Sequence, residues 1–436
     1  MQHPPQNPPL APSGSAAGPL LFGLGGIAGA AFTAFLLRAT APEEDLDLRT
    51  YATVRGLIED EYVLPTDRDA LLAEAMDAMA GSLDPYSRYY VGERLSRVRQ
   101  ETLGTFLGLG AIFEQPMDGG RLLFPMPGSP AAQAGLRVGD ELLTFDGVRL
   151  DELAPGGFAE LLGKLEPRTI DVEVRRLDGT VEQLELTPAT VLDPTVRHAD
   201  LLEHGVGYVA VTSFSRETPA ELDRAVRELE DRGAHGLILD LRGNPGGVLT
   251  AALEVINRFV PSGVLLITET REGHIEEEAF PELATLADLP LVVLVDGDSA
   301  SASEVVAGAL QDHRRAPIVG TETYGKGTIQ TLTPLGEPDG MLKITTGFYQ
   351  TPSGRSIDRH YRGDGGSAIR PDVEVELDAN ERRALHAHLA RYSPAYQDAQ
   401  DVDDLERELG REPRERVRRD AQLEAALALL AGSEAQ

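Results

Sequence analysis

Three residue types are missing or scarce in this chain of 436 residues: it has no cysteine, no tryptophan and only three lysines. Without cysteine, the chain has no thiol nucleophile, no disulfide framework and no cysteine-ligated metal. Positive charge is also short, because 40 Lys and Arg stand against 71 Asp and Glu, a net charge of -31. Nucleic acids and anionic lipids bind to basic surfaces, so this balance argues against both as partners.

The N-terminus contains a long uncharged apolar segment. Residues 1–18 are rich in proline and lack Lys and Arg, so we expect this leader to be disordered. Residues 20–37 would span ~27 Å as a helix, enough to cross a bilayer. We therefore predict a transmembrane anchor or signal at 19–38, with the rest of the chain outside the cytoplasm, in the periplasm or cell envelope. The run Ala-Thr-Ala at 39–41 resembles a cleavage site, but Pro42 after it favours an uncleaved anchor.

The remainder of the chain changes pattern several times, and its length predicts about three domains of ~150 residues. The run Leu237–Leu241, apolar except for Asp240 and without polar alternation, is typical of a parallel strand covered on both faces. Strands alternate with helices around it, which predicts an α/β core of βαβ units around a mixed sheet. The predicted segments are a helical one at 44–102, a strand-rich one at 103–190, the α/β core at 191–378 and a charged helical C-terminal region at 379–436.

Helix boundaries in the α/β core carry local signals. Thr218-Pro219-x-Glu221 combines an N-cap, a first-turn proline and a capping box, so we expect a helix to begin there. Gly233 stands where this helix should end. A second helix is expected from about Leu249 to Val260.

Two residues of the core point to chemistry. Ser301 opens an apolar helix directly after a predicted strand, which is where open α/β folds collect their sites. Lys326 lies between Gly325 and Gly327, and lysine can lose its proton when buried whereas arginine effectively cannot. To act as a base, its pKa must fall from about 10.4 toward neutrality, which burial can achieve. Gln330 follows four residues later and is placed to orient the amine.

A serine that attacks a carbonyl also needs donors for the oxyanion. The N–H of Ala302 is one candidate, and the tight turn Asn244–Gly247 is a second source. Each reacting residue has an ordinary explanation too, since Ser301 fits a helix N-cap and Lys326 fits a solvated loop. His313 is no alternative base, because it ends the same predicted helix about 18 Å from Ser301.

Together these segments resemble the C-terminal processing peptidases, which are serine endopeptidases with a Ser-Lys dyad and an inserted PDZ domain. The resemblance runs from about Tyr51 to Val375. It implies that Ser301 is the nucleophile, Lys326 the general base and Gln330 the residue that orients it. The motifs that carry it occur in the family's order: Gly207-Tyr-Val, Leu237–Gly247, Ser299–Glu304, Ala307–His313, Gly325–Gly327 and Tyr349–Ile357.

The same resemblance implies an oxyanion hole made by Gly246 or Gly247 together with Ala302. None of the departures from the family's pattern removes a reacting group, although one places a negative charge close to the nucleophile. These departures are Asp298 where glycine is usual, Gly243 where asparagine is usual and Thr328 where serine is common.

The segment 103–190 resembles the PDZ domain. Gly108-Leu109-Gly110 matches its carboxylate-binding loop, and Ser129–Asp140 matches its most recognisable stretch. In such a loop, successive N–H groups cradle a terminal carboxylate while the peptide adds a strand to the sheet. The resemblance implies cleavage at or near the C-termini of exported proteins, with the PDZ domain gating activity and substrates with free C-termini as partners.

Other interpretations stay open at this point. A catalytically silent PDZ adaptor would carry a vestigial dyad, and a different hydrolase could use the same scaffold. No cofactor or metal is expected, because the histidines lack ligand spacing; His386 and His388 fall on different faces of a predicted helix. The apolar run Leu423–Leu430 fits either an oligomer contact or a packed terminal helix, so a homo-oligomer or a regulatory partner is not decided.

Overall fold

The computed structural model describes residues 46–114, 122–126, 128–154, 156–336, 340–359, 367–389, 403–405, 407 and 416–433. It divides into two compact units, Met1–Ala75 and Met76–Gln436. The predicted disordered leader 1–18 and the predicted membrane segment 20–37 lie outside the described residues. Among the helices that are described, none combines the length and apolarity needed to cross a bilayer.

The segment predicted to be helical, 44–102, contains a strand as well. Its helices are α2 (Leu46–Glu61), α3 (Arg68–Gly81) and α4 (Gly92–Leu103), and the strand is β1 (Arg88–Val91). β1 pairs antiparallel with β18 (Gly340–Gln350), with Arg88 opposite Lys343. The segment is mainly helical, and strand β1 was not predicted because it is short and its partner strand lies far along the chain.

The core is built on a six-stranded sheet of order β10-β11-β12-β15-β16-β19. In this sheet β11, β12, β15, β16 and β19 run parallel to one another, and β10 pairs antiparallel with β11. This mixed sheet, built of βαβ units, confirms the predicted fold class. The strands are β10 (Val196–Leu201), β11 (Val206–Val211), β12 (Gly236–Asp240), β15 (Leu291–Val295), β16 (Ile318–Gly320) and β19 (Val373–Glu374).

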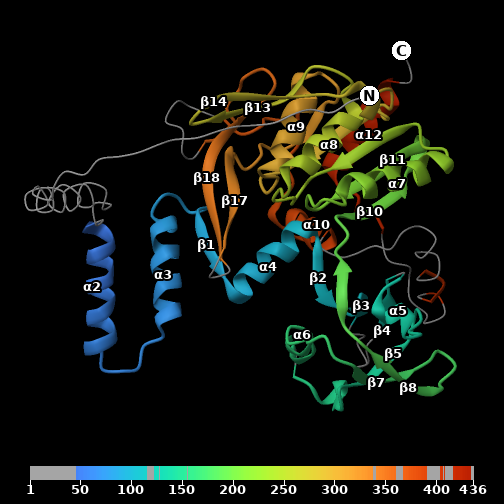
Figure 1. Cartoon of the computed structure of the whole chain (residues 1–436). Helices are drawn as coiled ribbons and strands as arrows, with labels where there is room; N and C mark the ends of the chain where they lie inside the picture. Colours follow the sequence, from blue (N-terminus) through green and yellow to red (C-terminus); the bar gives the residue numbers. More distant parts are fainter. Residues whose placement is uncertain are drawn as a thin grey trace, which may run out of the picture. The chain divides into compact units, whose positions relative to one another are not determined.

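Helices cover both faces of this sheet. Successive residues of a strand point to opposite faces, so neighbouring residues pack against different helices. Leu239 packs in the apolar cluster that includes α7 (Thr218–Asp231), α8 (Leu249–Phe259) and α9 (Ala302–Asp312). Its neighbour Ile238 packs in a second cluster, with α10 (Ala379–Leu389) and α12 (Ala421–Ser433). Figure 1 shows these helices around the strands. Two covered faces explain why the strand sequences are apolar without alternation.

A second sheet carries the surroundings of Lys326. Its order is β1-β18-β13-β14, and β17 pairs with β18. β17 (Thr328–Leu335) begins two residues after Lys326, and Gln330 lies opposite Thr345 of β18. The candidate base therefore stands at the start of a long antiparallel hairpin. The remaining strands are β13 (Val264–Thr270) and β14 (Gly273–Glu278).

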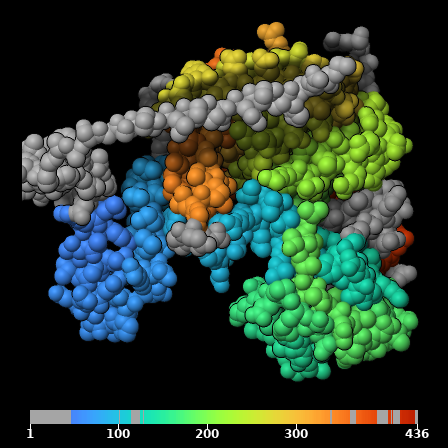
Figure 2. Space-filling view, in the orientation of Figure 1, coloured from blue at the N-terminus to red at the C-terminus, as the bar shows by residue number. Residues whose placement is uncertain are grey.

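The strand-rich segment has a core of its own, which includes the fully buried Val172 and Val174. Its main sheet has the order β3-β4-β5-β7-β8, with β6 on β5, and β2 pairs with β9 where the chain enters and leaves. Its surface forms a continuous lobe in Figure 2. The elements are β2 (Thr105–Gly108), β3 (Ala111–Glu114), β4 (Leu122–Pro125), α5 (Pro130–Gln133), β5 (Glu141–Phe145), β6 (Val148–Arg149), α6 (Gly157–Leu162), β7 (Ile170–Arg175), β8 (Val181–Leu186) and β9 (Ala189–Leu192). Short 3-10 turns span Leu150–Glu152, Glu203–Gly205 and Pro281–Leu283.

Helix α7 begins where predicted, but its capping box does not form. The Thr218 hydroxyl accepts the N–H of Ser215 at 2.8 Å, and Glu221 does not turn back to Thr218. Instead the Glu221 carboxylate accepts the N–H groups of Thr195 and Val196, at 2.8 and 2.9 Å. The motif was misread because strand β10 offers two donors that local sequence does not reveal. Gly233, with φ +97°, follows the end of α7 as predicted.

The C-terminal apolar run packs against the core sheet. Leu423 of α12 is fully buried, and Leu430 is 6% exposed, both in the cluster that includes Ile238 and Val292. Of the two explanations for this run, the packed terminal helix is therefore the one found.

Candidate active site

Ser301 occupies a strained position between a strand and a helix. The loop 296–300 follows β15, and α9 begins at Ala302. Ser301 has φ 57° and ψ -115°, a conformation that L residues rarely adopt and that costs on the order of 1–3 kcal/mol. Its side chain is nearly buried, with the residue 8% exposed. Such strain persists only where the surroundings hold the residue firmly.

Backbone and side-chain hydrogen bonds hold the loop before Ser301. The carbonyl of Asn244 accepts the N–H of Ala300 at 3.0 Å and the hydroxyl of Ser303 at 2.9 Å. The Ser299 hydroxyl donates to the carbonyl of Leu241 at 2.8 Å. The nucleophile loop is therefore fastened to the chain that follows β12, which contains the predicted oxyanion turn.

The oxyanion turn lies directly against Ser301. A Cβ on Gly246 would lie 2.9 Å from the Ser301 Cβ and 3.0 Å from the Ala302 nitrogen, so only glycine fits. The Gly246 N–H is already used, because it donates to the Asn244 side-chain oxygen at 2.8 Å. Among the described residues, the N–H groups of Gly247 and Ala302 have no acceptor. Of the predicted donors, Gly247 and Ala302 are thus the pair available to an oxyanion.

Lys326 is half-buried in the loop between β16 and β17. Burial lowers the pKa of Lys326, the charge of Lys343 lowers it further, and Glu304 and Asp84 oppose this. The net direction is the one that a general base needs. Its Nζ lies over the ring of Tyr86, 4.5 Å from the ring centroid.

Glu304, for which the sequence predicts no role, joins the backbones of Ser301 and Lys326. One carboxylate oxygen accepts the N–H of Ser301 at 2.8 Å and the N–H of Lys326 at 2.9 Å. The other accepts the N–H of Gly325 at 2.7 Å and the hydroxyl of Thr323 at 2.6 Å. Burial raises the pKa of Glu304 against these four hydrogen bonds. The available signal was a lone acid in an apolar helix, three residues after Ser301, in a capping-box pattern.

Gln330 and Tyr349 complete the surroundings. The Gln330 amide donates to the hydroxyls of Thr328 at 2.9 Å and Thr345 at 3.3 Å. Within the described part of the chain, it makes no hydrogen bond to Lys326. Burial raises the pKa of Tyr349, and interaction with the Ser301 side chain opposes this. Tyr349 lies within one of the motifs of the family resemblance, but nothing in its local sequence predicts that it lies beside Ser301.

The loop predicted to bind a carboxylate lies in the strand-rich segment, between β2 and β3. Gly110 has φ +64°, and its carbonyl accepts the N–H of Met126 at 2.8 Å, which shapes the turn. The N–H groups of Leu109 and Gly110 have no acceptor among the described residues. β3, which follows the loop, is an edge strand of its sheet.

Comparison with known proteins places this geometry in a family. Residues 205–375 match peptidase family S41. The carboxy-terminal-processing protease of Bartonella bacilliformis is 33% identical over 334 residues, which cover 76% of this chain and 75% of that protein. The carboxyl-terminal-processing protease of Synechocystis sp. is 36% identical over 329 residues, covering 73% and 75%. The chain belongs to the carboxy-terminal processing proteases of family S41.

Two further comparisons bear on this family. Residues 125–176 match the PDZ domain, so the S41 peptidase contains one within the strand-rich segment. Among solved structures, the photosystem II D1 C-terminal processing protease is 28% identical, with a TM-score of 0.42, and the match covers 77% of this chain and 90% of that one. As a member of family S41, the chain is a serine-type peptidase.

The described geometry gives this S41 peptidase the parts of an acyl-transfer site. The site offers a serine hydroxyl in a strained turn, two free N–H groups beside it and a lysine whose pKa is lowered. Such groups have the chemistry that a nucleophile, oxyanion donors and a general base require.

Proposed function

We propose that the chain hydrolyses peptide bonds through a Ser301–Lys326 dyad. Neutral Lys326 accepts the proton of Ser301 as the hydroxyl attacks the carbonyl, and passes it to the leaving amine. Gly247 and Ala302 donate to the oxyanion, and water then hydrolyses the acyl-enzyme, with Lys326 as base again.

The observation that best supports this proposal is the shared carboxylate oxygen of Glu304. It accepts the backbone N–H groups of Ser301 and Lys326 at 2.8 and 2.9 Å, so one atom fixes the backbones of both reacting residues. Ser301 and Lys326 are 25 positions apart in the sequence, and the buried side chain of Glu304 joins them. Catalytic hydrogen bonds between side chains often tighten only when substrate is bound.

The dyad is tested with the full-length protein in detergent, an unfolded protein substrate and mass spectrometry of the fragments. We expect Ser301→Ala and Lys326→Arg to fold like the wild type and to lose activity by about 10⁴-fold. Alanine has no hydroxyl to attack the carbonyl, and a guanidinium stays protonated and cannot act as a base. Turnover by Lys326→Arg at the wild-type rate would rule out lysine as the base. The fragment ends also report whether cleavage falls at or near the C-terminus of the substrate, as we propose.

We further propose that the PDZ domain, within the predicted extent 103–190, binds substrate C-termini through Gly108, Leu109 and Gly110. Two free N–H groups at Leu109 and Gly110, followed by the edge strand β3, support a carboxylate cradle with strand addition. Peptides with free C-termini should bind and amidated ones should not, measured by fluorescence anisotropy on Ser301→Ala. Binding of free C-termini without cleavage by the wild type, under all conditions, would instead favour the adaptor.

Gating and location belong to the same proposal. If substrate binding at the PDZ domain gates the dyad, a free C-terminal peptide should raise cleavage of a second, short substrate, and its amidated form should not. We also propose an extracytoplasmic enzyme anchored through residues 20–37. Protease added to spheroplasts, whose cytoplasmic membrane is intact, should then degrade residues 44–436, whereas a cytoplasmic protein would be protected.

A further inference from the structure

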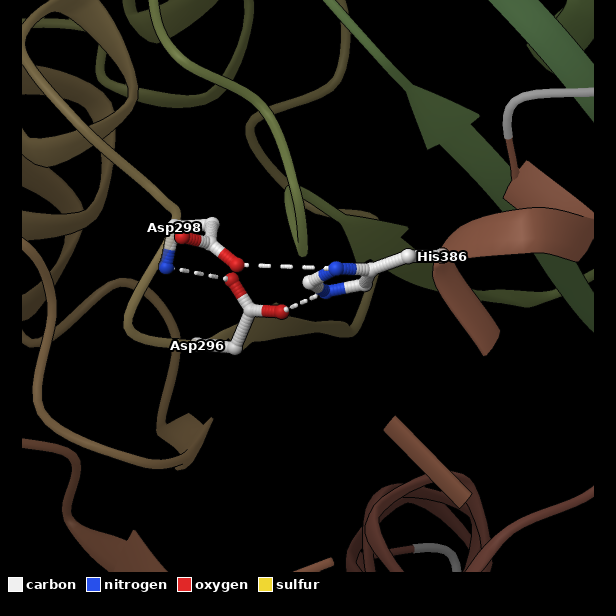
Figure 3. A group of neighbouring side chains, drawn as sticks. All are labelled: Asp296, Asp298 and His386. Carbon is white, nitrogen blue, oxygen red and sulfur yellow. Dashed lines mark hydrogen bonds and ion pairs between the residues drawn. The ribbon is translucent and has the colours of Figure 1, made fainter. Parts of the chain in front are cut away.

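A polar cluster lies at the nucleophile loop, beside helix α10. Figure 3 shows Asp296 and Asp298 of this loop converging on His386 of α10. The His386 Nε2 is 2.6 Å from the Asp296 carboxylate, and its Nδ1 is 3.5 Å from the Asp298 carboxylate. Three such groups within 4.8 Å of one another invite a metal ion. Here, however, each ring nitrogen of His386 faces a different carboxylate. A metal ion would need one of these two nitrogens as a ligand, and that nitrogen is already directed at a carboxylate.

We propose that His386 is a positioning residue for Ser301: its imidazolium bridges Asp296 and Asp298 and so holds the nucleophile loop in its reactive conformation. The inference rests on the proposed role of Ser301 as nucleophile. It makes the C-terminal region, through α10, part of the machinery of the active site.

Asp296 is the anchor of the loop, which is why its partner matters. One carboxylate oxygen accepts the N–H groups of Gly243, Asp298 and Ser299, at 2.9, 3.1 and 3.1 Å. Gly243 leads into the turn that carries Gly246 and Gly247. The same carboxylate thus joins the nucleophile loop to the oxyanion turn, and His386 holds its other oxygen. A change at His386 is therefore transmitted to both sides of the site.

Asp298 is the reason that a charged imidazole is needed. Its carboxylate lies within 4.8 Å of that of Asp296, and two negative charges so close together repel each other. His386 lies between them and offsets this repulsion.

The charged groups around His386 favour its protonated form. Its hydrogen bond to Asp296 raises the pKa of His386, partial burial lowers it, the charges of Asp296 and Asp298 raise it, and Arg242 at the end of β12 lowers it. Arg242 is itself paired with Asp240 and Asp420. Arg197 of β10 lines the same pocket of about 410 Å³ as His386 and Asp298. Because the net shift is upward, the bridge is complete below the ordinary histidine pKa and is lost as pH rises through the raised one.

A double-mutant cycle on the full-length protein tests this role, with kcat and KM measured separately. Glutamine at 386 can still donate a hydrogen bond but carries no charge. We expect His386→Gln to lower kcat about tenfold with KM unchanged, and Asp298→Gly in the same chain to restore most of the loss, because it removes the repulsion. A wild-type kcat in His386→Gln, or no recovery in the double variant, would overturn the proposal. Melting temperatures show whether each variant is folded.

The pH profile provides a test in which His386 stays in place. In the wild type, kcat should fall on the alkaline side as His386 loses its proton, and in Asp298→Gly, where the repulsion is gone, this fall should largely disappear. An unmoved profile contradicts the bridge, and so does loss of activity on adding EDTA, which would indicate a metal ion instead. Ser301→Ala separates the two proposals: activity in that variant refutes the dyad, whereas a dead Ser301→Ala beside an unaffected His386→Gln refutes the bridge alone.

Discussion

The two halves of the active site are held in different ways. Ser301 lies in a loop that Asn244, Asp296 and Glu304 fasten through short hydrogen bonds, in a strained conformation. Lys326 has its backbone fixed by Glu304, but its ammonium rests on the face of the Tyr86 ring. Ser301, the proposed nucleophile, is thus fixed in advance, whereas Glu304 fixes only the backbone of Lys326, the proposed base. This fits their proposed tasks, since Ser301 must hold one position for attack, whereas Lys326 takes up and releases a proton in each turnover.

Among these variants, the largest loss of activity is expected from a substitution at Gly246, next to Ser301. In Gly246→Ala, the new Cβ would meet the Ser301 Cβ at 2.9 Å and the Ala300 oxygen at 2.8 Å, at a φ of +102°. Because this displaces the nucleophile and the oxyanion turn together, we expect kcat to fall about 10²- to 10³-fold. Steady-state kinetics on a cleaved peptide measures it.

A matched control separates this contact from backbone strain. Gly179 also has a positive φ, +87°, but a Cβ there meets nothing within 4 Å. Gly179→Ala should therefore cost stability, by about 1 kcal/mol, and leave kcat intact. If both variants lose activity equally, positive φ and not the Ser301 contact is the cause.

The next largest effect is expected at Glu304, which joins the backbones of Ser301 and Lys326. Glutamine cannot accept all four hydrogen bonds, because its NH₂ group would face two of the donors. We expect Glu304→Gln to lower the free energy of unfolding by about 1–3 kcal/mol for each donor left unpaired, and to lower kcat about tenfold to a hundredfold. Urea denaturation and kinetics measure the two effects, with Glu230→Gln on the exposed face of α7 as control. A stable Glu304→Gln with normal kcat would show that the shared oxygen is dispensable.

How far the sequence predicts this site follows from the range of the interactions. Ser301, Ala302 and the turn Asn244–Gly247 follow strand ends, so local pattern placed them in candidate roles. The choice of Gly247 over Gly246 was not accessible, because it depends on the Asn244 side chain taking one N–H. Tyr86 and His386 come from segments far from Ser301 in the chain, and only the folded structure brings them to the loops. Strand β1 was missed for the same reason.

The pKa of Lys326 can be probed through the neighbouring charge of Lys343. The Lys343 ammonium lowers the pKa of Lys326, so Lys343→Gln should raise it again. Since only neutral Lys326 acts as base, the rise of kcat/KM with pH should then move to higher pH. Lys164→Gln removes the third lysine of the chain, which lies in an exposed part of the strand-rich segment, and should leave the profile in place. Equal shifts in both variants would point to net charge and not to Lys343.

The smallest effect is expected from the ring beneath the ammonium. An aromatic face stabilises a cation by about 0.5–1 kcal/mol at partly exposed sites, so Tyr86 favours the protonated, inactive form of Lys326. Tyr86→Leu should therefore move the rise of kcat/KM to lower pH, whereas Tyr86→Phe keeps the ring and should leave it in place. The two profiles differ only if the ring face acts on the base. If phenylalanine and leucine give the same profile, the ring does not act on Lys326, and its pKa is set by burial and by the charges of Lys343, Glu304 and Asp84.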